Sequence, residues 1–197
     1  MIFIIIGEGE MMASEKHFGF LALIKDENRN SYLGALLVVD LMGRPIEFRV
    51  TFPIKPTAIQ RPLYGDALEP YIGVDLCGKQ LINSVDHDLE LIFVNQEYLL
   101  DIRKDYDIPA IFIKHAGDVI EVSTIDDKKP FGQKKQLSSE SGRFQPVVIY
   151  SSPIAPDDLE DATEVVNQFF EDTDLIEPFD RIYNALDILV SQDERFQ

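Results

Sequence analysis

Three apolar runs, separated only by short turn-forming clusters, constrain the fold of this chain more than any other feature. The runs cover residues 18–25, 32–40 and 45–52, and the stretches DENRNS and LMGR lie between them. Connections this short typically join neighbouring antiparallel strands. The middle run contains ALLVV, whose unbroken apolar character indicates a strand buried on both faces. The sequence therefore predicts a three-stranded antiparallel meander.

The third run leads into a region of helical and extended patterns. IEFRVTF alternates, so that Glu47, Arg49 and Thr51 share one face of the strand. TAIQ, at residues 57–60, is a capping box, and we expect short helices broken by prolines and glycines after it. Further strands are expected at residues 89–94 and 108–114, with a helix capped by Asn95 between them.

The remaining segments complete a mixed α/β pattern. DVIEVSTI is a candidate edge strand, DDKKPFGQKKQLSSESGR a polar loop, and FQPVVIYSS another strand. MIFIII is either a first strand or lies upstream of the true start at Met11 or Met12. The predicted fold class is α/β, a mixed sheet with three antiparallel strands at its start and helices packed on it. This order of elements resembles the start of the ribonuclease H-like fold.

Negative charge is concentrated near the end of the chain. The net charge is −17, and residues 151–197 contain thirteen acidic and two basic side chains. We therefore expect a mixed α/β domain over residues 1–150 and an acidic helical segment over residues 151–197 that packs on it. The last helix carries an apolar stripe, which either joins the core or docks onto a partner subunit. Its members are Phe179, Ile182, Tyr183, Leu186 and Leu189.

Reactive and metal-binding patterns are sparse in the sequence. Cys77 is the only cysteine, and its apolar neighbours predict a small core residue, so we expect neither an internal disulfide nor a thiol nucleophile. His17, His87 and His115 are scattered and form no metal-binding pattern. No apolar run reaches the roughly 18–20 residues of a membrane span. The sequence predicts a cytoplasmic protein without a cofactor, and it leans against an enzyme.

The resemblance to the ribonuclease H-like fold can be tested on acidic residues. Nucleases of that fold hold two metal ions on carboxylates, one of them inside the first strand. The first predicted strand, FGFLALIK, has no acid in its interior. A metal site built from Asp26, Asp40 and Glu47 is the alternative that the sequence offers, and it lacks that central member.

One basic stretch stands out in this acidic chain. KKPFGQKK carries four lysines, Lys128, Lys129, Lys134 and Lys135, around a single phenylalanine. Lysines beside an aromatic ring suit a phosphate backbone and a stacked base. The simpler interpretation, which we favour from sequence, is a solvated loop whose lysines offset neighbouring acids.

Residues 43–71, GRPIEFRVTFPIKPTAIQRPLYGDALEPY, combine five prolines with arginines, acids and aromatic rings. Prolines reduce the conformational entropy of the unfolded chain, so this stretch loses less entropy on folding than a stretch of equal length without prolines. We expect Arg44, Glu47 and Arg49 to pair with Glu69 or Asp66 across the connection between the third strand and the following helix. The stretch is then either a rigid crossover between these two elements or a preorganised recognition surface. The predicted interaction surface consists of Arg44, Glu47, Arg49, Gln60, Tyr64, Glu69 and Tyr71.

The same stretch resembles a family of uncharacterised bacterial proteins. In that family a Gly-Arg-Pro-x-Glu-Phe strand leads to a Pro-x-x-Pro turn, then to Leu-Tyr-Gly and Leu-Glu-Pro-Tyr. The similarity runs from about residue 18 to residue 114, and EPFDRIYNAL near the end is also similar. The resemblance implies a bacterial, cytoplasmic source and carries over no catalytic residue.

The functional prediction from sequence is a non-enzymatic interaction subunit of a larger bacterial assembly, with a protein partner or a second copy as its ligand. The alternative is a nucleic-acid-processing accessory protein or a degenerate ribonuclease H-like nuclease. A third option is small-molecule binding beside Arg44, Arg49 and Tyr64.

Overall fold

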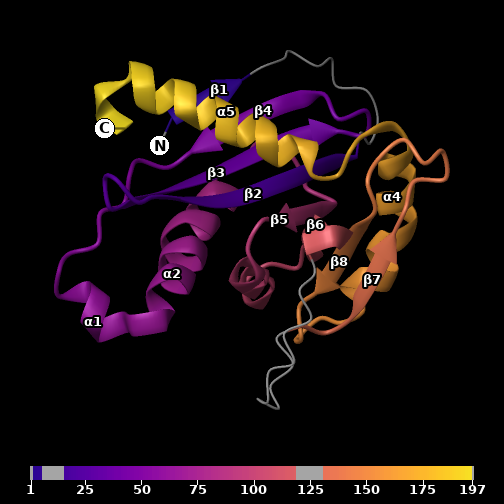
Figure 1. Ribbon diagram of the computed structural model, residues 1–197, viewed down its shortest axis with the longest axis horizontal. Helices are drawn as coiled ribbons and strands as arrows, with labels where there is room; N and C mark the ends of the chain where they lie inside the picture. The colour runs from indigo at the N-terminus through magenta and orange to yellow at the C-terminus, as the bar shows by residue number, and fades with distance from the viewer. Residues whose placement is uncertain (1, 6–15, 119–130, 197) are drawn as a thin grey trace.

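A computed structural model describes residues 2–5, 16–118 and 131–196 of the protein (Figure 1). Within these ranges eight strands form one mixed sheet in the order β1-β4-β3-β2-β5-β6-β8-β7. The strands are β1 (Ile2–Ile5), β2 (His17–Asp26), β3 (Ser31–Asp40), β4 (Pro45–Val50), β5 (Leu91–Val94), β6 (Ala110–His115), β7 (Lys134–Leu137) and β8 (Val147–Ser151).

Helical segments connect and cover these strands. The longest are α4 (Asp158–Asp172) and α5 (Glu177–Gln192). Between β4 and β5 the chain runs through α1 (Gln60–Tyr64), η1 (Gly65–Ala67), α2 (Leu68–Pro70), the π-helical η2 (Tyr71–Gly78) and α3 (Lys79–Ile82). The 3₁₀ segments η3 (Glu97–Lys104), η4 (Ala116–Asp118) and η5 (Glu194–Phe196) complete the list. No helix in the described part of the chain is long and apolar enough to cross a membrane.

The predicted meander is confirmed. β2 and β3 pair over their full ten residues, from His17 opposite Asp40 to Asp26 opposite Ser31, and β4 adds to the far side of β3. β5 then pairs with β2 in parallel, and β6 pairs with β5 in parallel. Three antiparallel strands followed by two parallel ones reproduce the ribonuclease H-like order that the sequence predicted.

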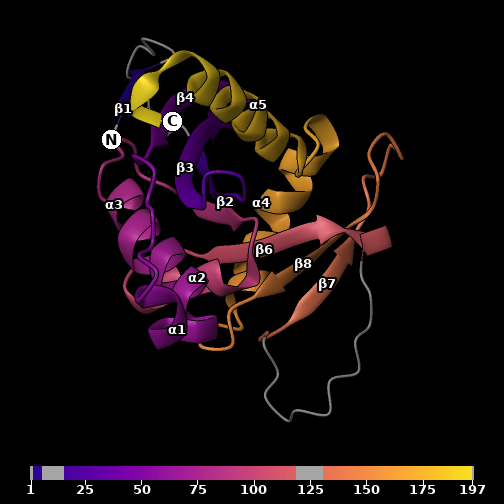
Figure 2. The same cartoon turned by 60° about the vertical axis from the view of Figure 1, so that its left-hand side comes forward.

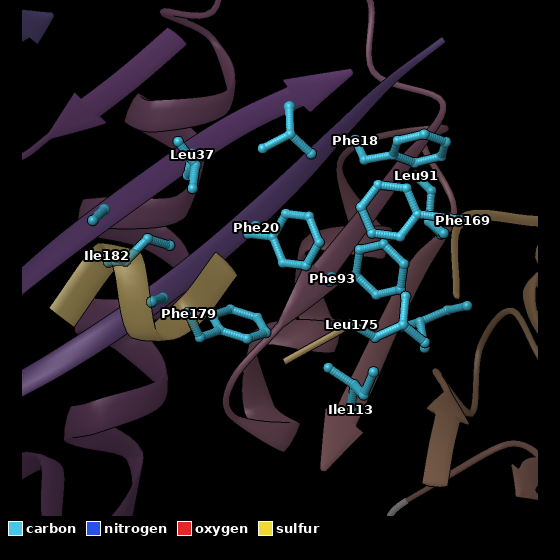
Figure 3. Packing of buried hydrophobic residues seen from close by; sticks show 14 of the residues in the cluster. Phe18, Phe20, Leu37, Leu91, Phe93, Ile113, Phe169, Leu175, Phe179 and Ile182 are labelled. Atoms are coloured by element: carbon cyan, nitrogen blue, oxygen red, sulfur yellow. The ribbon is translucent and has the colours of Figure 1, made fainter. Parts of the chain in front are cut away.

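Helices cover both faces of the sheet (Figure 2). One face packs against α4 and α5, and the other against η3 and the helical run of residues 60–82. The first core is rich in aromatic rings, which lie side by side in Figure 3. Phe20 is 4.8 Å from Phe93 and 5.4 Å from Phe179 between ring centroids, and Phe18 is 5.1 Å from Phe169. Stacked and edge-on pairs of this kind stabilise a core beyond the area they bury.

The end of the chain belongs to this core. In α5 the side chains of Phe179, Ile182 and Leu186 are buried against the strands, whereas Tyr183 remains 38% exposed. Phe196 of η5 is also buried. The apolar stripe that the sequence left open between core and partner surface therefore packs on the body of the protein.

Some local predictions were wrong or fall outside the described residues. The predicted polar loop of residues 126–143 contains β7, whose pairing with β8 the polar sequence KKQL did not indicate. Asn95 does not cap the following helix, because its side chain bonds the backbone of Leu23. The candidate edge strand DVIEVSTI lies almost wholly outside the described residues.

Candidate nucleic-acid interface

The parallel strands β2, β5 and β6 all end at the same edge of the sheet. In open α/β sheets, ligands bind in the crevice outside the carboxyl ends of such strands. At this edge β2 ends in Lys25 and Asp26, β5 is followed by Asn95, and β6 ends in Lys114 and His115. We call it the carboxyl edge.

The side chain of Asn95 closes the centre of this edge. Its Oδ1 accepts from the amide of Leu23 at 3.1 Å, and its Nδ2 donates to the Leu23 carbonyl at 3.3 Å. The same Nδ2 donates to the hydroxyl of Tyr183 on α5 at 3.1 Å. Asn95 thus ties the end of β5 to β2 and to the helical layer.

An aromatic cluster with two lysines lies beyond β5 in the sheet order, on β6, β8 and the start of β7. Tyr150 of β8 pairs with Phe112 of β6 on one side and with Lys134 of β7 on the other. Phe131 stacks on Phe112 with ring centroids 5.9 Å apart, and its ring is 4.4 Å from that of Tyr150. The ammonium of Lys114 lies 5.6 Å from the Phe112 centroid and 5.4 Å from the Tyr150 centroid.

Exposure differs within this aromatic cluster, which consists of Phe112, Phe131, Tyr150, Lys114 and Lys134. Phe112 and Tyr150 are buried, while Phe131 and Lys114 are half-buried and Lys134 is exposed. Two buried rings therefore fix the position of a third ring that reaches solvent beside two cations. A rigid ring with adjacent positive charge is the arrangement that single-stranded nucleic acids favour.

A polar pocket lies at the same edge, where β3 begins. It has a volume of about 380 Å³ and is lined by Tyr32, Arg61, Gly65, Asp66, Leu68 and Glu69. The Tyr32 hydroxyl donates to Oε1 of Glu69 at 3.0 Å, and the Lys25 ammonium lies 3.3 Å from the same oxygen. Desolvation, followed by the bond to Glu69, raises the pKa of Tyr32. The pKa of Lys25 is raised by its bonds to Glu27 and then Glu69.

The alternative metal site is wrong, because the structure separates its three carboxylates. Asp26 and Asp40 lie at opposite ends of the β2–β3 ladder, nine residue steps or about 30 Å apart. Asp26 bonds Arg29, and Asp40 bonds Arg44. Among the residues that the structure describes, no three His, Cys, Asp or Glu side chains gather where they could hold a metal ion.

Glu47 is instead part of a buried charge cluster near the start of β5. Glu47 and Arg49 are 2% and 3% exposed and bond each other directly. Arg49 Nη2 donates to Asp86 at 2.8 Å, and Nδ1 of His87 lies 2.9 Å from Oε2 of Glu47. The ring of His17 meets that of His87 edge-on at 4.9 Å. These charges compensate one another within the fold.

The predicted interaction surface is therefore divided between separate places. Glu47 and Arg49 are buried and unavailable to a partner, and neither pairs with Glu69 or Asp66 as expected. Gln60 forms the predicted capping box, since its Oε1 accepts from the amide of Thr57 at 2.8 Å. Arg44 bonds Asp40. Tyr64 stacks on Tyr71 at 5.0 Å, and only Glu69 reaches the pocket.

The remaining predicted residues fall into three groups. Lys134 and Lys135 lie on β7, whereas Lys128 and Lys129 lie outside the described residues. Cys77 is buried as expected, and desolvation raises its pKa to about 11. The proposed small-molecule site is not formed, because Arg44, Arg49 and Tyr64 engage different neighbours.

The pocket and most of the aromatic cluster are not predictable from the sequence. The sequence places Phe131 among lysines, but it indicates only strands for its neighbours Phe112 and Tyr150. Their register across β6 and β8 requires pairing information that no short motif contains. The side-chain partners of Glu69 lie 37 and 44 residues earlier in the chain and were equally hidden.

No protein-family model and no curated protein sequence matches this chain. Solved structures do match its fold. Endonuclease V from Ciona intestinalis, in complex with a 24mer DNA containing an inosine followed by a ribo-adenosine, is 12% identical with a TM-score of 0.50, over 80% of this chain and 78% of that chain. A variant of that enzyme in complex with a 23mer DNA is 11% identical with a TM-score of 0.48, and the match covers the same shares of the two chains. Endonuclease V from Bacillus subtilis is 10% identical with a TM-score of 0.38, and the match covers 80% of this chain and 69% of that chain.

These matches correct the leading functional prediction. A non-enzymatic protein-interaction subunit was favoured from sequence, and the comparison contradicts that interpretation, because the solved structure that matches with a TM-score of 0.50 is an Endonuclease V nuclease. The alternative, a nucleic-acid-processing protein on a ribonuclease H-like fold, fits the likeness better.

Proposed function

We propose that this protein binds single-stranded nucleic acid at the aromatic cluster on β6, β8 and β7, as a nucleic-acid-processing accessory protein built on a degenerate nuclease fold. The observation that carries the proposal is the aromatic cluster. It combines the half-buried ring of Phe131 with the cations of Lys114 and Lys134.

Stacking supplies most of the expected affinity. An aromatic side chain that stacks on a base contributes about 1–3 kcal/mol and tolerates any base, because every base has a π-face. Phe131 is held by two buried rings, so little side-chain freedom remains to be lost when a base stacks on it.

Electrostatics makes the binding local and sensitive to salt. The chain carries a net charge of −17, which repels a polyanion at long range. The lysines of the aromatic cluster attract phosphates at short range, and each neutralised phosphate of a single strand adds about −0.7 to the slope of log K against log salt. We therefore expect weak binding at physiological salt that strengthens markedly at low ionic strength.

The fold supports the choice of ligand. The Endonuclease V of similar fold was solved in complex with DNA. The interior of β2 is apolar where a two-cation nuclease of this fold places an acid, so the proposal is binding without that cleavage chemistry.

Fluorescence anisotropy with labelled single-stranded DNA and RNA tests the proposal across a series of salt concentrations. Phe131→Ala is expected to weaken binding by about 1–3 kcal/mol, which corresponds to roughly 5- to 150-fold. Lys134→Glu should weaken it further at low salt and flatten the salt slope. Lys104→Glu is the matched control, because this exposed lysine pairs with Asp101 on η3 and lies outside the aromatic cluster.

Two results would overturn the proposal: no binding to either strand at low salt, or equal binding by all variants. A parallel incubation with Mg²⁺ or Mn²⁺ separates an accessory protein from a nuclease. We expect the strands to remain intact, and metal-dependent cleavage by the purified protein would refute the absence of nuclease chemistry.

A further inference from the structure

The pocket beside Glu69 differs from the aromatic cluster in what it can recognise. It is lined by the buried phenol of Tyr32 at the start of β3 and by one guanidinium and two carboxylates from α1, η1 and α2. We infer that this pocket binds a guanine base, with the attached phosphate on Arg61. This inference rests on the proposed function, because it names the base that a bound strand would place there.

The walls of the pocket are set by burial and by one glycine. Tyr32 is 1% exposed and Leu68 is 5% exposed, so both are fixed in the core beneath it. Gly65 has a φ of 53°, a conformation that other residues rarely adopt, and it redirects the chain between α1 and α2. The resulting volume of about 380 Å³ lies within the range of small-molecule sites.

Glu69 is held in place for a ligand. Its Oε1 accepts from the Tyr32 hydroxyl at 3.0 Å and contacts the Lys25 ammonium at 3.3 Å. Among the described residues these contacts use Oε1, so a ligand can take Oε2 as its acceptor. Asp66 lines the same space and adds a second carboxylate. Ionised carboxylates accept hydrogen bonds and cannot donate them, so the ligand must present donors.

The donor pattern selects guanine among the four bases of RNA. The Watson–Crick edge of guanine places two donors side by side, N1–H and the N2 amino group. Adenine and cytosine each place an unprotonated ring nitrogen at that edge, and a carboxylate repels it. Uracil has one ring N–H between two carbonyl acceptors. Only guanine therefore offers adjacent donors to the acceptors of Glu69 and Asp66.

Arg61 supplies the counterpart for the phosphate. It lines the pocket, and its guanidinium also bonds the side chain of Asn30 in the β2–β3 turn. A guanidinium can form two parallel hydrogen bonds to a phosphate. Arg61 thus offsets one of the two lining carboxylates, and Lys25, from outside the lining, contacts Glu69.

Isothermal titration with GMP, AMP and guanosine tests the inference on the wild-type chain. GMP should bind at least about tenfold more tightly than AMP, since hydrogen bonds to charged groups contribute about 1.5–3 kcal/mol. Guanosine should retain the preference for the base and lose the contribution of the phosphate. Glu69→Gln should abolish the preference of GMP over AMP, because the amide replaces an acceptor with a donor.

The matched control is Glu27→Gln. Glu27 is the other carboxylate that contacts Lys25, at 2.8 Å, but it does not line the pocket. This variant should keep the preference for GMP. Circular dichroism of all variants confirms that each one folds, and Glu69 is exposed enough at 42% for the substitution to be tolerated.

The outcomes separate this inference from the proposed function. Equal affinity for GMP and AMP, or no binding of either, overturns the guanine site even if a thymine-only strand still binds through Phe131. In a second outcome, GMP binds with a preference that Glu69→Gln abolishes, while no single-stranded DNA or RNA binds at low salt. The guanine site then stands and the proposed function fails. Loss of the preference in both Glu69→Gln and Glu27→Gln would assign the effect to Lys25 and refute recognition by Glu69.

Discussion

The two halves of residues 43–71 have similar compositions and opposite environments. The strand half, β4, buries Glu47 and Arg49 in a charge cluster with Asp86 and His87. The helical half, from α1 to Tyr71, leaves most of its side chains in solvent, including Leu63 at 76% exposed. Arginine and glutamate stabilise the fold in one half and line an open pocket in the other.

This difference shows which charged residues can serve a ligand. In β4 the charges of Glu47 and Arg49 are covered by residues later in the chain, so their hydrogen bonds are formed within the protein. In the helical half, Gly65 and the prolines break the helix, and Arg61 and Glu69 remain at the rim of a cavity. The residue types alone do not distinguish the two roles, whereas burial does.

The largest effect is expected from breaking the charge cluster in the strand half. Arg49→Met removes the cation and leaves Glu47 buried without it, which should lower the free energy of unfolding by about 3–5 kcal/mol. Urea denaturation measures this loss. Oligonucleotide affinity of the folded fraction should not change, because β4 is separated in the sheet order from the aromatic cluster on β6, β8 and β7.

A double variant, Glu47→Leu with Arg49→Met, is the control for that prediction. Replacing both charges by apolar side chains should cost less than Arg49→Met alone. A loss below about 1 kcal/mol in the single variant would show that the pair behaves like an exposed one, contrary to its burial.

An intermediate effect concerns Cys77, which contacts the end of the strand half. Its thiol lies 3.9 Å from the hydroxyl of Thr51, and burial raises its pKa from 9.0 to about 11. The unfolded chain releases this proton first, so stability is complete below pH 9 and falls as pH rises toward 11. The loss should reach about 2–3 kcal/mol.

Comparison with Cys77→Ala isolates this contribution, since the variant has no thiol to ionise. The difference in unfolding free energy between the two proteins should shrink steadily between pH 9 and 11. A constant difference across that range would show that the thiol is not desolvated in solution.

The smallest effect tests the backbone of the helical half. Gly65→Ala places a Cβ at a φ of 53°, and the strain should cost about 1–2 kcal/mol although no atom lies within 4 Å of the new carbon. Gly117→Ala is the control, because its surroundings are equally open and its φ is ordinary. Equal thermal stability of the two variants would contradict a strained turn beside the pocket.

Much of the fold was predictable because its signals are local. Alternation in IEFRVTF and the short DENRNS turn define the meander, and the Thr57–Gln60 capping box is a four-residue pattern that the structure confirms. The sequence of β7 does not indicate a strand, because KKQL has neither alternation nor β-branched residues. Its strand state comes from pairing with β8.

The candidate site was largely hidden for the same reason. The alternating sequence places Glu47 and Arg49 on the polar face of their strand. Their burial depends on Asp86 and His87, about 40 residues later in the chain, which bond them. Phe131 belongs to a cluster only because the register of β6 and β8 places Phe112 beside Tyr150, and no local pattern indicates that register. The similarity to a bacterial family through residues 43–71 remains a prediction.

The edge strand β7 has a further consequence for how the molecule behaves at high concentration. An outermost strand offers unpaired backbone groups to other chains, and natural proteins often protect such strands with lysine. Lys134 and Lys135 place two like charges at the start of β7, where a second copy that paired in parallel would align its own pair beside them. Self-association through this border of the sheet is therefore opposed by repulsion, and a polyanion that neutralised the lysines would weaken that protection.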